Sequence, residues 1–164
     1  MGLDITAHTK LRVARLMTED EINTGEYPYE THARFYDNPH FPGRIGSIQP
    51  GTLYLSPEKN RLRFRAGSYS GYGEWRRQLA ALVGIKDIRA LWGDPEAAGP
   101  FAELINFADN EGTIGPEVSA KLAKDFAEHQ AAADAHEDAW FRDRYAMWRR
   151  AFEMAADAGA VDFH

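Results

Sequence analysis

The sequence predicts an α+β fold, in which a small antiparallel sheet packs against a set of helices. Short stretches of alternating polar and apolar residues, bounded by Gly, Pro and Asn, are confined to residues 1–66. Apolar residues spaced three or four apart, as in amphipathic helices, dominate residues 67–164. Strands and helices therefore do not alternate along the chain, which argues against a doubly wound parallel sheet. The length of 164 residues and the 44% hydrophobic content suit a single domain spanning residues 1–164.

Two N-terminal hairpins are expected to build the sheet. The first joins residues 3–8 to residues 11–17, and the second joins residues 52–56 to residues 61–66 across a turn that contains Pro and Asn. The intervening residues 18–51 are rich in Pro, Gly, Asn and aromatic side chains, which predicts a long irregular loop. Loops longer than about 12 to 15 residues in compact domains are often binding loops or lids.

Helices are expected in the second half of the chain. The first covers residues 72–83, and two short helical pieces fall within residues 88–107. A helix opened by a proline over residues 116–133 and a final helix over residues 137–158 are predicted to form a long antiparallel pair. Residues 161–164 are short and apolar enough to dock back onto the body. The final helix carries the clearest apolar stripe, which consists of Phe141, Tyr145, Trp148 and Phe152.

Composition excludes several classes of function. The sequence has no cysteine, so zinc–thiolate sites, thiol nucleophiles and disulfides are excluded. There is no run of about 18 apolar residues and no signal-peptide pattern, so we expect a cytoplasmic protein that makes no membrane contact. The histidines lack the spacing of a zinc motif and no cofactor-binding fingerprint occurs, so we predict neither a metal nor a cofactor.

The net charge of −6 is unevenly distributed along the chain. Residues 1–93 contain 13 Lys and Arg against 10 Asp and Glu (+3), whereas residues 94–164 contain 6 against 15 (−9). The acidic half argues against direct binding of nucleic acid, while the basic half suits a small anion. Alternatively, the two halves pair electrostatically within one molecule or across a homodimer interface.

The strongest candidate site lies in residues 61–73. Three arginines alternate with Leu62 and Phe64, so they share one strand face, and the Gly, Ser and Tyr loop that follows opens a helix. Fixed cations, hydroxyl groups and a helix N-terminus are typical of an anion cradle, and aromatic rings can stack a base. The alternative is a solvated strand face, a glycine turn and tyrosines that belong to the core. The predicted ligand-binding residues are Arg61, Arg63, Arg65, Ser68, Tyr69, Ser70, Tyr72, Trp75 and Arg76.

A second candidate is the loop over residues 109–115, which joins two helices. Asp109 and Glu111 can act as an acid and a base or bind a divalent cation. Thr113 and Asn106 add polar groups that we expect to complete the same cleft. The spacing of an EF-hand is absent, and helix ends need similar residues for capping, so capping is the alternative explanation.

Several segments together resemble one family. They are the opening Met-Gly-Leu-Asp-Ile-Thr-Ala, the central Ala-Gly-Ser-Tyr-Ser-Gly-Tyr, the runs at residues 103–109 and 111–115, and the ending Ala-Val-Asp-Phe-His. Over nearly its whole length the chain resembles an uncharacterised family of small proteins encoded by tailed bacteriophages and prophages. The resemblance carries no catalytic motif. It implies a host bacterial cytosol, where such proteins often counter host defences by sequestering nucleotide signals or by binding defence proteins.

The leading functional prediction is a non-enzymatic, phage-derived binding protein for a small anionic or nucleotide-like ligand. The ligand is expected between the arginine strand, the Ser/Tyr/Gly loop and residues 109–115. An alternative is an inhibitor that binds a host protein through the acidic helices, and exposed Trp140 and Met147 would mark such a partner or dimer surface. A different class is a small hydrolase or phosphodiesterase, with Asp109 and Glu111 as acid and base and the three arginines holding the substrate.

Overall fold

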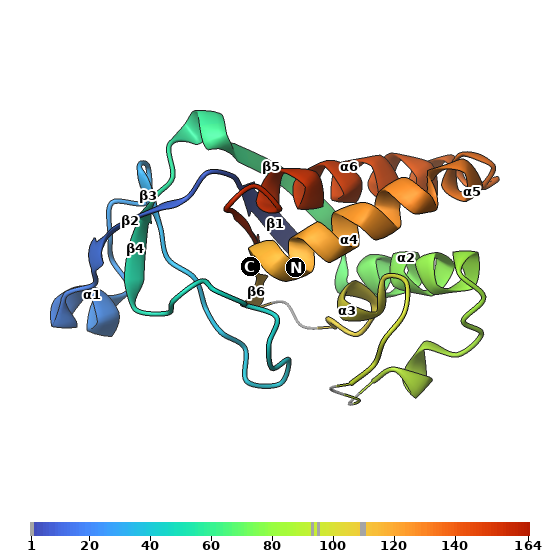
Figure 1. Cartoon of the computed structure of the whole chain (residues 1–164), viewed down its shortest axis with the longest axis horizontal. Coiled ribbons are helices and arrows are strands. Elements are labelled where there is room, and N and C mark those ends of the chain that lie inside the picture. The colour runs from blue at the N-terminus through green and yellow to red at the C-terminus, as the bar shows by residue number, and fades with distance from the viewer. Residues whose placement is uncertain (1, 93, 95, 109–110) are drawn as a thin grey trace.

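The computed structural model describes every residue of the chain except 1, 93, 95, 109 and 110. It shows two antiparallel sheets, one of four strands and one of three, together with several helices. The four-stranded sheet lies in the middle of the molecule, the long helices extend to one side of it, and the smaller sheet lies on the other side (Figure 1). The α+β class predicted from the sequence is therefore confirmed.

The larger sheet brings together strands from both ends of the chain. Its order is β5 (Arg61–Gly67), β1 (Leu3–His8), β7 (Ala160–Phe163) and β6 (Gly112–Ile114), and all neighbours are antiparallel. The expectation that the C-terminal residues dock onto the body is confirmed, since β7 is an inner strand of this sheet.

Both predicted hairpins are wrong in their pairing. The smaller sheet has the order β2 (Arg12–Leu16), β4 (Thr52–Leu55) and β3 (His32–Ala33), so β2 pairs with β4 and not with β1. After β1 the chain turns away at Lys10, whose φ is +53°, and the Lys10 N–H donates to the carbonyl of Asp157 (2.8 Å). The second hairpin fails for a similar reason, because a 3-10 turn leads the chain from β4 into the larger sheet.

The helices follow the predicted order with shifted ends. The Ser68 hydroxyl accepts a hydrogen bond from the Gly71 N–H (3.0 Å), and this cap starts α2 three residues before the predicted Tyr72. His129 separates α4 from α5, where a single helix was expected. The helical elements are α1 (Glu19–Thr24), η1 (Glu58–Asn60), α2 (Tyr69–Leu82), η2 (Ile88–Ala90), α3 (Ala102–Ile105), α4 (Pro116–Glu128), α5 (Gln130–Asp134) and α6 (Ala139–Ala155).

The core lies between the larger sheet and the helices. α4 and α6 run side by side in opposite directions, linked by α5 (Figure 1). Trp148 of α6 is 1% exposed, and its ring centroid lies 5.1 Å from that of Phe64 in β5 and 5.5 Å from that of Trp75 in α2. The predicted stripe on this helix is confirmed as core, since its four aromatic residues are at most 1% exposed.

The segment over residues 18–51 is more structured than the predicted irregular loop. It contains α1 and β3, and Phe35, Ile45 and Ile48 anchor it in a second, smaller core with Tyr54 of β4. This packing holds the segment against the face of the larger sheet that the helices leave uncovered.

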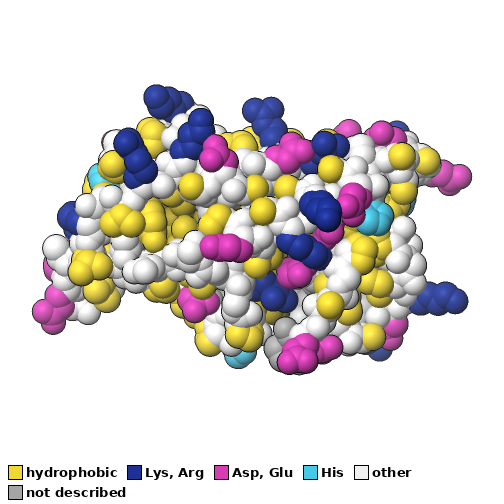
Figure 2. Space-filling model, in the orientation of Figure 1, with side chains coloured by type: hydrophobic (Ala, Val, Ile, Leu, Met, Phe, Trp, Pro, Cys, Tyr) yellow, Lys and Arg dark blue, Asp and Glu magenta, His cyan; other side chains and the backbone are white. Residues whose placement is uncertain are grey.

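The surface mixes charges of both signs. On the face shown in Figure 2, basic and acidic side chains are interspersed. An example of close pairing is Lys121, whose Nζ lies 2.7 Å from carboxylate oxygens of both Glu103 and Asp125. Among the described residues, no helix is both long and apolar enough to cross a membrane.

Candidate functional site

The larger sheet has an apolar face and a polar face. Ile5 and Phe163 are buried in the core at 1% exposure, so the residues that alternate with them point to the opposite side. Directly paired residues of antiparallel strands share a face, and the register therefore builds one polar row across all four strands. That row consists of Arg63, Thr6, Asp162 and Thr113.

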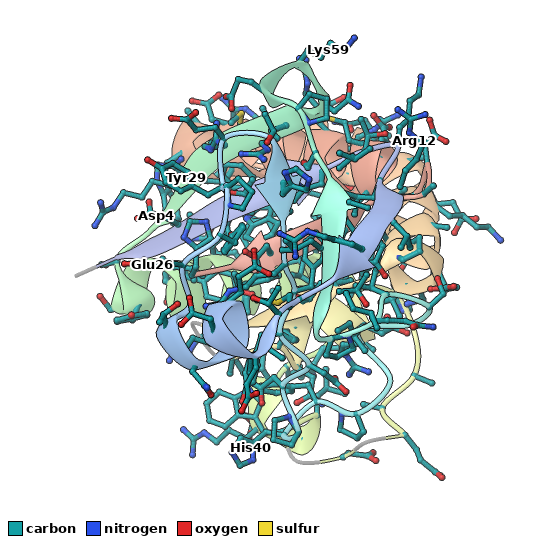
Figure 3. All side chains as sticks on the ribbon, turned by 90° about the vertical axis from the view of Figure 1, so that its left-hand side faces the viewer. Asp4, Arg12, Glu26, Tyr29, His40 and Lys59 are labelled. Atoms are coloured by element: carbon teal, nitrogen blue, oxygen red, sulfur yellow. The ribbon has the colours of Figure 1, made fainter. Side chains whose placement is uncertain are left out.

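A cavity of about 690 Å³ lies against this polar face, which we call the cleft. The volume is typical of small-molecule sites, which span roughly 300 to 1,000 Å³. Its floor comes from the sheet and includes Thr6, His8, Arg61, Arg63, Asp162 and His164. Its cover comes from the 18–51 segment and includes Tyr27, Tyr29, His32, Arg34 and Tyr36. In Figure 3, Tyr29 and Glu26 lie on the same side of the molecule as Asp4 of β1, whereas Arg12 lies on the opposite side.

Arg61 of β5 links the 18–51 segment to the larger sheet through hydrogen bonds. Its two terminal nitrogens donate to the carbonyls of Tyr29 (2.7 Å) and His32 (2.9 Å), and its Nε donates to the hydroxyl of Ser56 (3.1 Å). All three nitrogens are therefore engaged by the protein itself. Arg61, the first residue of the predicted arginine strand, therefore has three of its five N–H groups bonded within the protein and shapes the cleft.

His8 forms the deepest part of this network and is neutral. Its Nδ1 lies 2.7 Å from the hydroxyl oxygen of Ser56. The same hydroxyl oxygen also accepts a hydrogen bond from the Nε of Arg61. Burial, together with the charges of Arg61 and Arg63, lowers the pKa of His8 from 6.5 to about 3. The imidazole thus stays uncharged throughout the physiological pH range.

Two arginines of the cleft remain exposed enough to meet a ligand. Arg63 pairs with Glu58 at the surface, and both side chains are about half exposed or more. Arg34 lies with its guanidinium carbon 5.5 Å from the centre of the Tyr27 ring, and it forms no ion pair with any residue that the structure describes. An exposed ion pair is worth little, so an anionic ligand can displace Glu58 from Arg63 at small cost.

Asp162 is the carboxyl group of the cleft floor. It lies on an inner strand, and its Oδ1 accepts a hydrogen bond of 3.5 Å from the Thr113 hydroxyl. Burial raises the pKa of Asp162 to about 7, although the Thr113 hydrogen bond and the charge of Arg34 oppose the increase. Both protonation states are therefore populated near neutral pH.

Beside Asp162, a hydroxyl and an imidazole are in contact. The Thr6 Oγ1 lies 2.9 Å from the Nε2 of His164. Thr6 is buried at 6% exposure, whereas His164 is exposed to solvent and also lines the cleft. The sequence analysis missed this pair and Asp162 altogether. The signal was available, because Asp162 stands between the apolar Val161 and Phe163 in a pattern typical of an inner strand with one polar face.

Several predicted ligand-binding residues lie away from the cleft. Arg65 is exposed beyond its edge, and its carbonyl accepts a hydrogen bond from Arg144 (2.9 Å). Ser68 caps α2, and its hydroxyl lies 3.1 Å from that of Ser70. Tyr69 is 43% exposed at the same helix end. The Ser/Tyr/Gly loop therefore forms the N-terminal cap of α2.

The remaining members of the first set belong to the core, which corrects their assignment as ligand contacts. Tyr72 and Trp75 are at most 2% exposed, and both rings pack on Trp148. The Tyr72 hydroxyl and the Arg76 guanidinium donate to backbone carbonyls at the end of α3, at 2.9 Å and 2.6 Å. Asn106 is also buried and donates to a backbone carbonyl (3.2 Å).

The residues of the second predicted site, the 109–115 loop, differ in where they lie relative to the cleft. Asp109 lies outside the described residues, whereas Glu111 is exposed and lines the cleft. Thr113 lies in β6, a strand that was not predicted from the sequence. Its side chain is 1% exposed, and its hydroxyl donates a hydrogen bond to Asp162. Within the part of the chain that the structure describes, no three His, Asp or Glu side chains gather in a way that could hold a metal ion.

Comparisons with known proteins found no matching protein-family model, no matching curated protein and no matching solved structure.

Proposed function

We propose that the protein binds a small anionic, nucleotide-like ligand in the cleft between the polar sheet face and the 18–51 segment. The observation that carries this proposal is the pair Arg34 and Arg63, which line a cavity of about 690 Å³ and keep their guanidinium groups accessible. Guanidinium groups bind phosphate and carboxylate oxygens through charge-assisted, often bidentate hydrogen bonds.

The charge balance of the cleft favours an anion. Besides the two accessible arginines, Arg61 contributes a fixed positive charge at the floor. Among the described residues, the carboxyl side chains that line the cleft are those of Asp162, which is partly neutral near pH 7, and Glu111, which lies exposed to solvent. The local potential is therefore positive although the whole chain has a net charge of −6.

Aromatic rings at the cleft add a reason to expect a planar group in the ligand. Tyr29 is 67% exposed and Tyr36 is 51% exposed, and both line the cleft. Stacking of a base on such a ring contributes about 1 to 3 kcal/mol. The resemblance to phage proteins supports the same class of ligand, because sequestration of nucleotide signals is one of the roles that it implies.

The test begins with a thermal-shift screen against mono-, di- and cyclic nucleotides and sugar phosphates. A ligand at 100 times its dissociation constant adds about 2.7 kcal/mol to the free energy of unfolding, which raises the melting temperature measurably. For any ligand that binds, we expect Arg34→Ala to weaken the affinity by about 10- to 100-fold in calorimetric titration, since a hydrogen bond to a charged group contributes about 1.5 to 3 kcal/mol.

The matched control is Arg12→Ala, which removes an exposed arginine from β2 on the far side of the molecule (Figure 3). It changes the net charge equally, so it should leave the affinity within about twofold once salt screens the long-range field. Equal losses in the two variants, or no binding by any compound of the screen, would refute the proposed site.

A further inference from the structure

We propose that the cleft also hydrolyses its ligand, as a phosphate esterase in which Asp162 is the general acid and His164 is the general base. This inference depends on the proposed function, because the same arginines hold the phosphate group. In the hydrolase predicted from the sequence, Asp109 and Glu111 were the acid and the base. Here these roles are assigned instead to Asp162 and His164, which both line the cleft.

The spacing of the two groups fits a bond cleavage with an attacking water. Asp162 and His164 are two residues apart at the end of β7, both line the cleft, and neither shares the core-facing side of Phe163. Side chains at this spacing on a strand lie about 7 Å apart. Inverting glycoside hydrolases, which also activate a water on one side of the scissile bond and protonate the leaving group on the other, place their two catalytic groups about 6.5 to 9.5 Å apart, and we extend this comparison to a phosphate ester.

Thr6 positions the base. Its hydroxyl oxygen lies 2.9 Å from His164 Nε2, and Thr6 pairs directly with Asp162 across the neighbouring strands. With the Nε2 proton donated to Thr6, the Nδ1 of His164 keeps its lone pair for a proton from water. Thr6 therefore acts by orienting the His164 imidazole. Because Thr6 is also paired with Asp162, it places the base next to the acid.

The protonation state of Asp162 suits its role as the acid. Burial raises its pKa to about 7, so about half of the molecules carry the proton at neutral pH, against roughly 0.1% for an ordinary aspartate. Charged or titratable side chains of the described residues line the cleft around it: Arg34, Tyr27, Tyr29, His32 and Tyr36 from the 18–51 segment, Arg61, Arg63, His8 and His164 from the side of the sheet, and Glu111 from the edge.

The proposed reaction is balanced without a further reactant. The water oxygen bonds to phosphorus while His164 takes its proton. The bond between phosphorus and the leaving oxygen breaks, and that oxygen keeps the electron pair and receives the proton of Asp162. The products are an alcohol and a phosphate, and the proton on His164 returns to Asp162 through solvent. Arg34 and Arg63 stabilise the charge on the phosphate oxygens during the transfer.

The experiment measures binding and turnover on the same samples. Each nucleotide that stabilises the protein, together with p-nitrophenyl phosphate and bis(p-nitrophenyl) phosphate, is incubated with the wild type, Asp162→Asn, His164→Gln and the control Asp143→Asn, which changes an exposed carboxylate on α6. Products are separated by chromatography. We expect Asp162→Asn and His164→Gln to reduce turnover at least about 100-fold while ligand affinity stays within about threefold, and the control to match the wild type.

The possible failures are distinguishable. A nucleotide that binds the wild type but is recovered intact, with neither probe cleaved, overturns hydrolysis and leaves binding in place. Turnover that survives in Asp162→Asn overturns the assignment of the acid. Absence of both binding and turnover overturns the proposed function together with this inference. In the wild type, activity should decline as pH rises above about 7, following the loss of the Asp162 proton.

Discussion

Replacing Asp162 by asparagine should stabilise the protein at alkaline pH. The carboxyl group lies on an inner strand, with a hydroxyl 3.5 Å away and no basic partner at ion-pair distance among the described residues. Its pKa is raised from 3.8 to about 7 by burial. An amide has nearly the same shape and can accept the same hydrogen bond from Thr113, but it does not become charged. The substitution therefore removes the cost of burying a carboxylate.

The sign and size of the effect follow from proton linkage. Between pH 4 and 7 the folded protein holds the Asp162 proton while the unfolded chain has lost it, so the free energy of unfolding falls as pH rises through this range. Below pH 3.8 this contribution is absent, and above pH 7 it is complete. A difference of about three pKa units corresponds to about 4 kcal/mol. Because the cleft admits water, we expect a gain of about 2 to 4 kcal/mol for Asp162→Asn at pH 8.5.

Urea denaturation of both proteins from pH 4.5 to pH 8.5 measures this effect. The difference between variant and wild type should be small at pH 4.5 and should grow to its full value at pH 8.5. His8 contributes a pH dependence of the opposite kind, since its lowered pKa makes stability fall as pH drops below 6.5, but it is present in both proteins and cancels. Asp143→Asn is the exposed control, with an expected change below about 0.5 kcal/mol at every pH. A difference that does not vary with pH would refute the argument.

Three further predictions concern the scaffold of the protein, and all are measured by urea denaturation at pH 7. Ser56→Ala leaves His8 Nδ1 and Arg61 Nε without their shared partner and should cost about 1 to 3 kcal/mol; an unchanged stability would show that water replaces the hydroxyl. Gly159→Ala places a Cβ 1.9 Å from the carbonyl oxygen of His8, a backbone atom, and should cost about 3 kcal/mol. Gly73→Ala, whose Cβ meets nothing within 4 Å in α2, should instead add about 0.5 to 1 kcal/mol, and a loss there would contradict the packing described.

Periodicity located most elements of this fold but not the partners of its strands. The positions of β1, β4 and β5 and of the long helices agree with their predicted ranges to within a few residues. Alternation tells which face of a strand is buried, yet it carries no information on which strand lies next to it. The decisive turn occurs at Lys10, where a left-handed backbone in a residue other than glycine gives no signal in the sequence.

The candidate site was predicted in part, for a related reason. The alternation of Arg61 and Arg63 with Leu62 and Phe64 correctly places these arginines on a polar face. The prediction assigned the rest of the site to the Ser/Tyr/Gly loop, which comes next in the chain. The cleft is instead built by strands that are distant in sequence. Asp162 meets Thr6 only through pairing between the two ends of the chain, and residues so far apart cannot be brought together by local pattern.

We propose that the polar groups of the cleft floor serve a ligand, and the energetics of Asp162 support this proposal. Asp162 destabilises the fold whenever it is ionised, and an apolar residue at this inner-strand position would avoid that cost. By contrast, the nearby Ser56 is in hydrogen-bonding contact with both Arg61 and His8, and Arg61 also bonds to the 18–51 segment. A structural role in holding this segment in place therefore accounts for these three residues. Proteins accept unfavourable groups of the first kind mainly where chemistry or recognition requires them. If Asp162→Asn both gains stability at alkaline pH and loses turnover, the cost in stability and the activity are traced to the same carboxyl group.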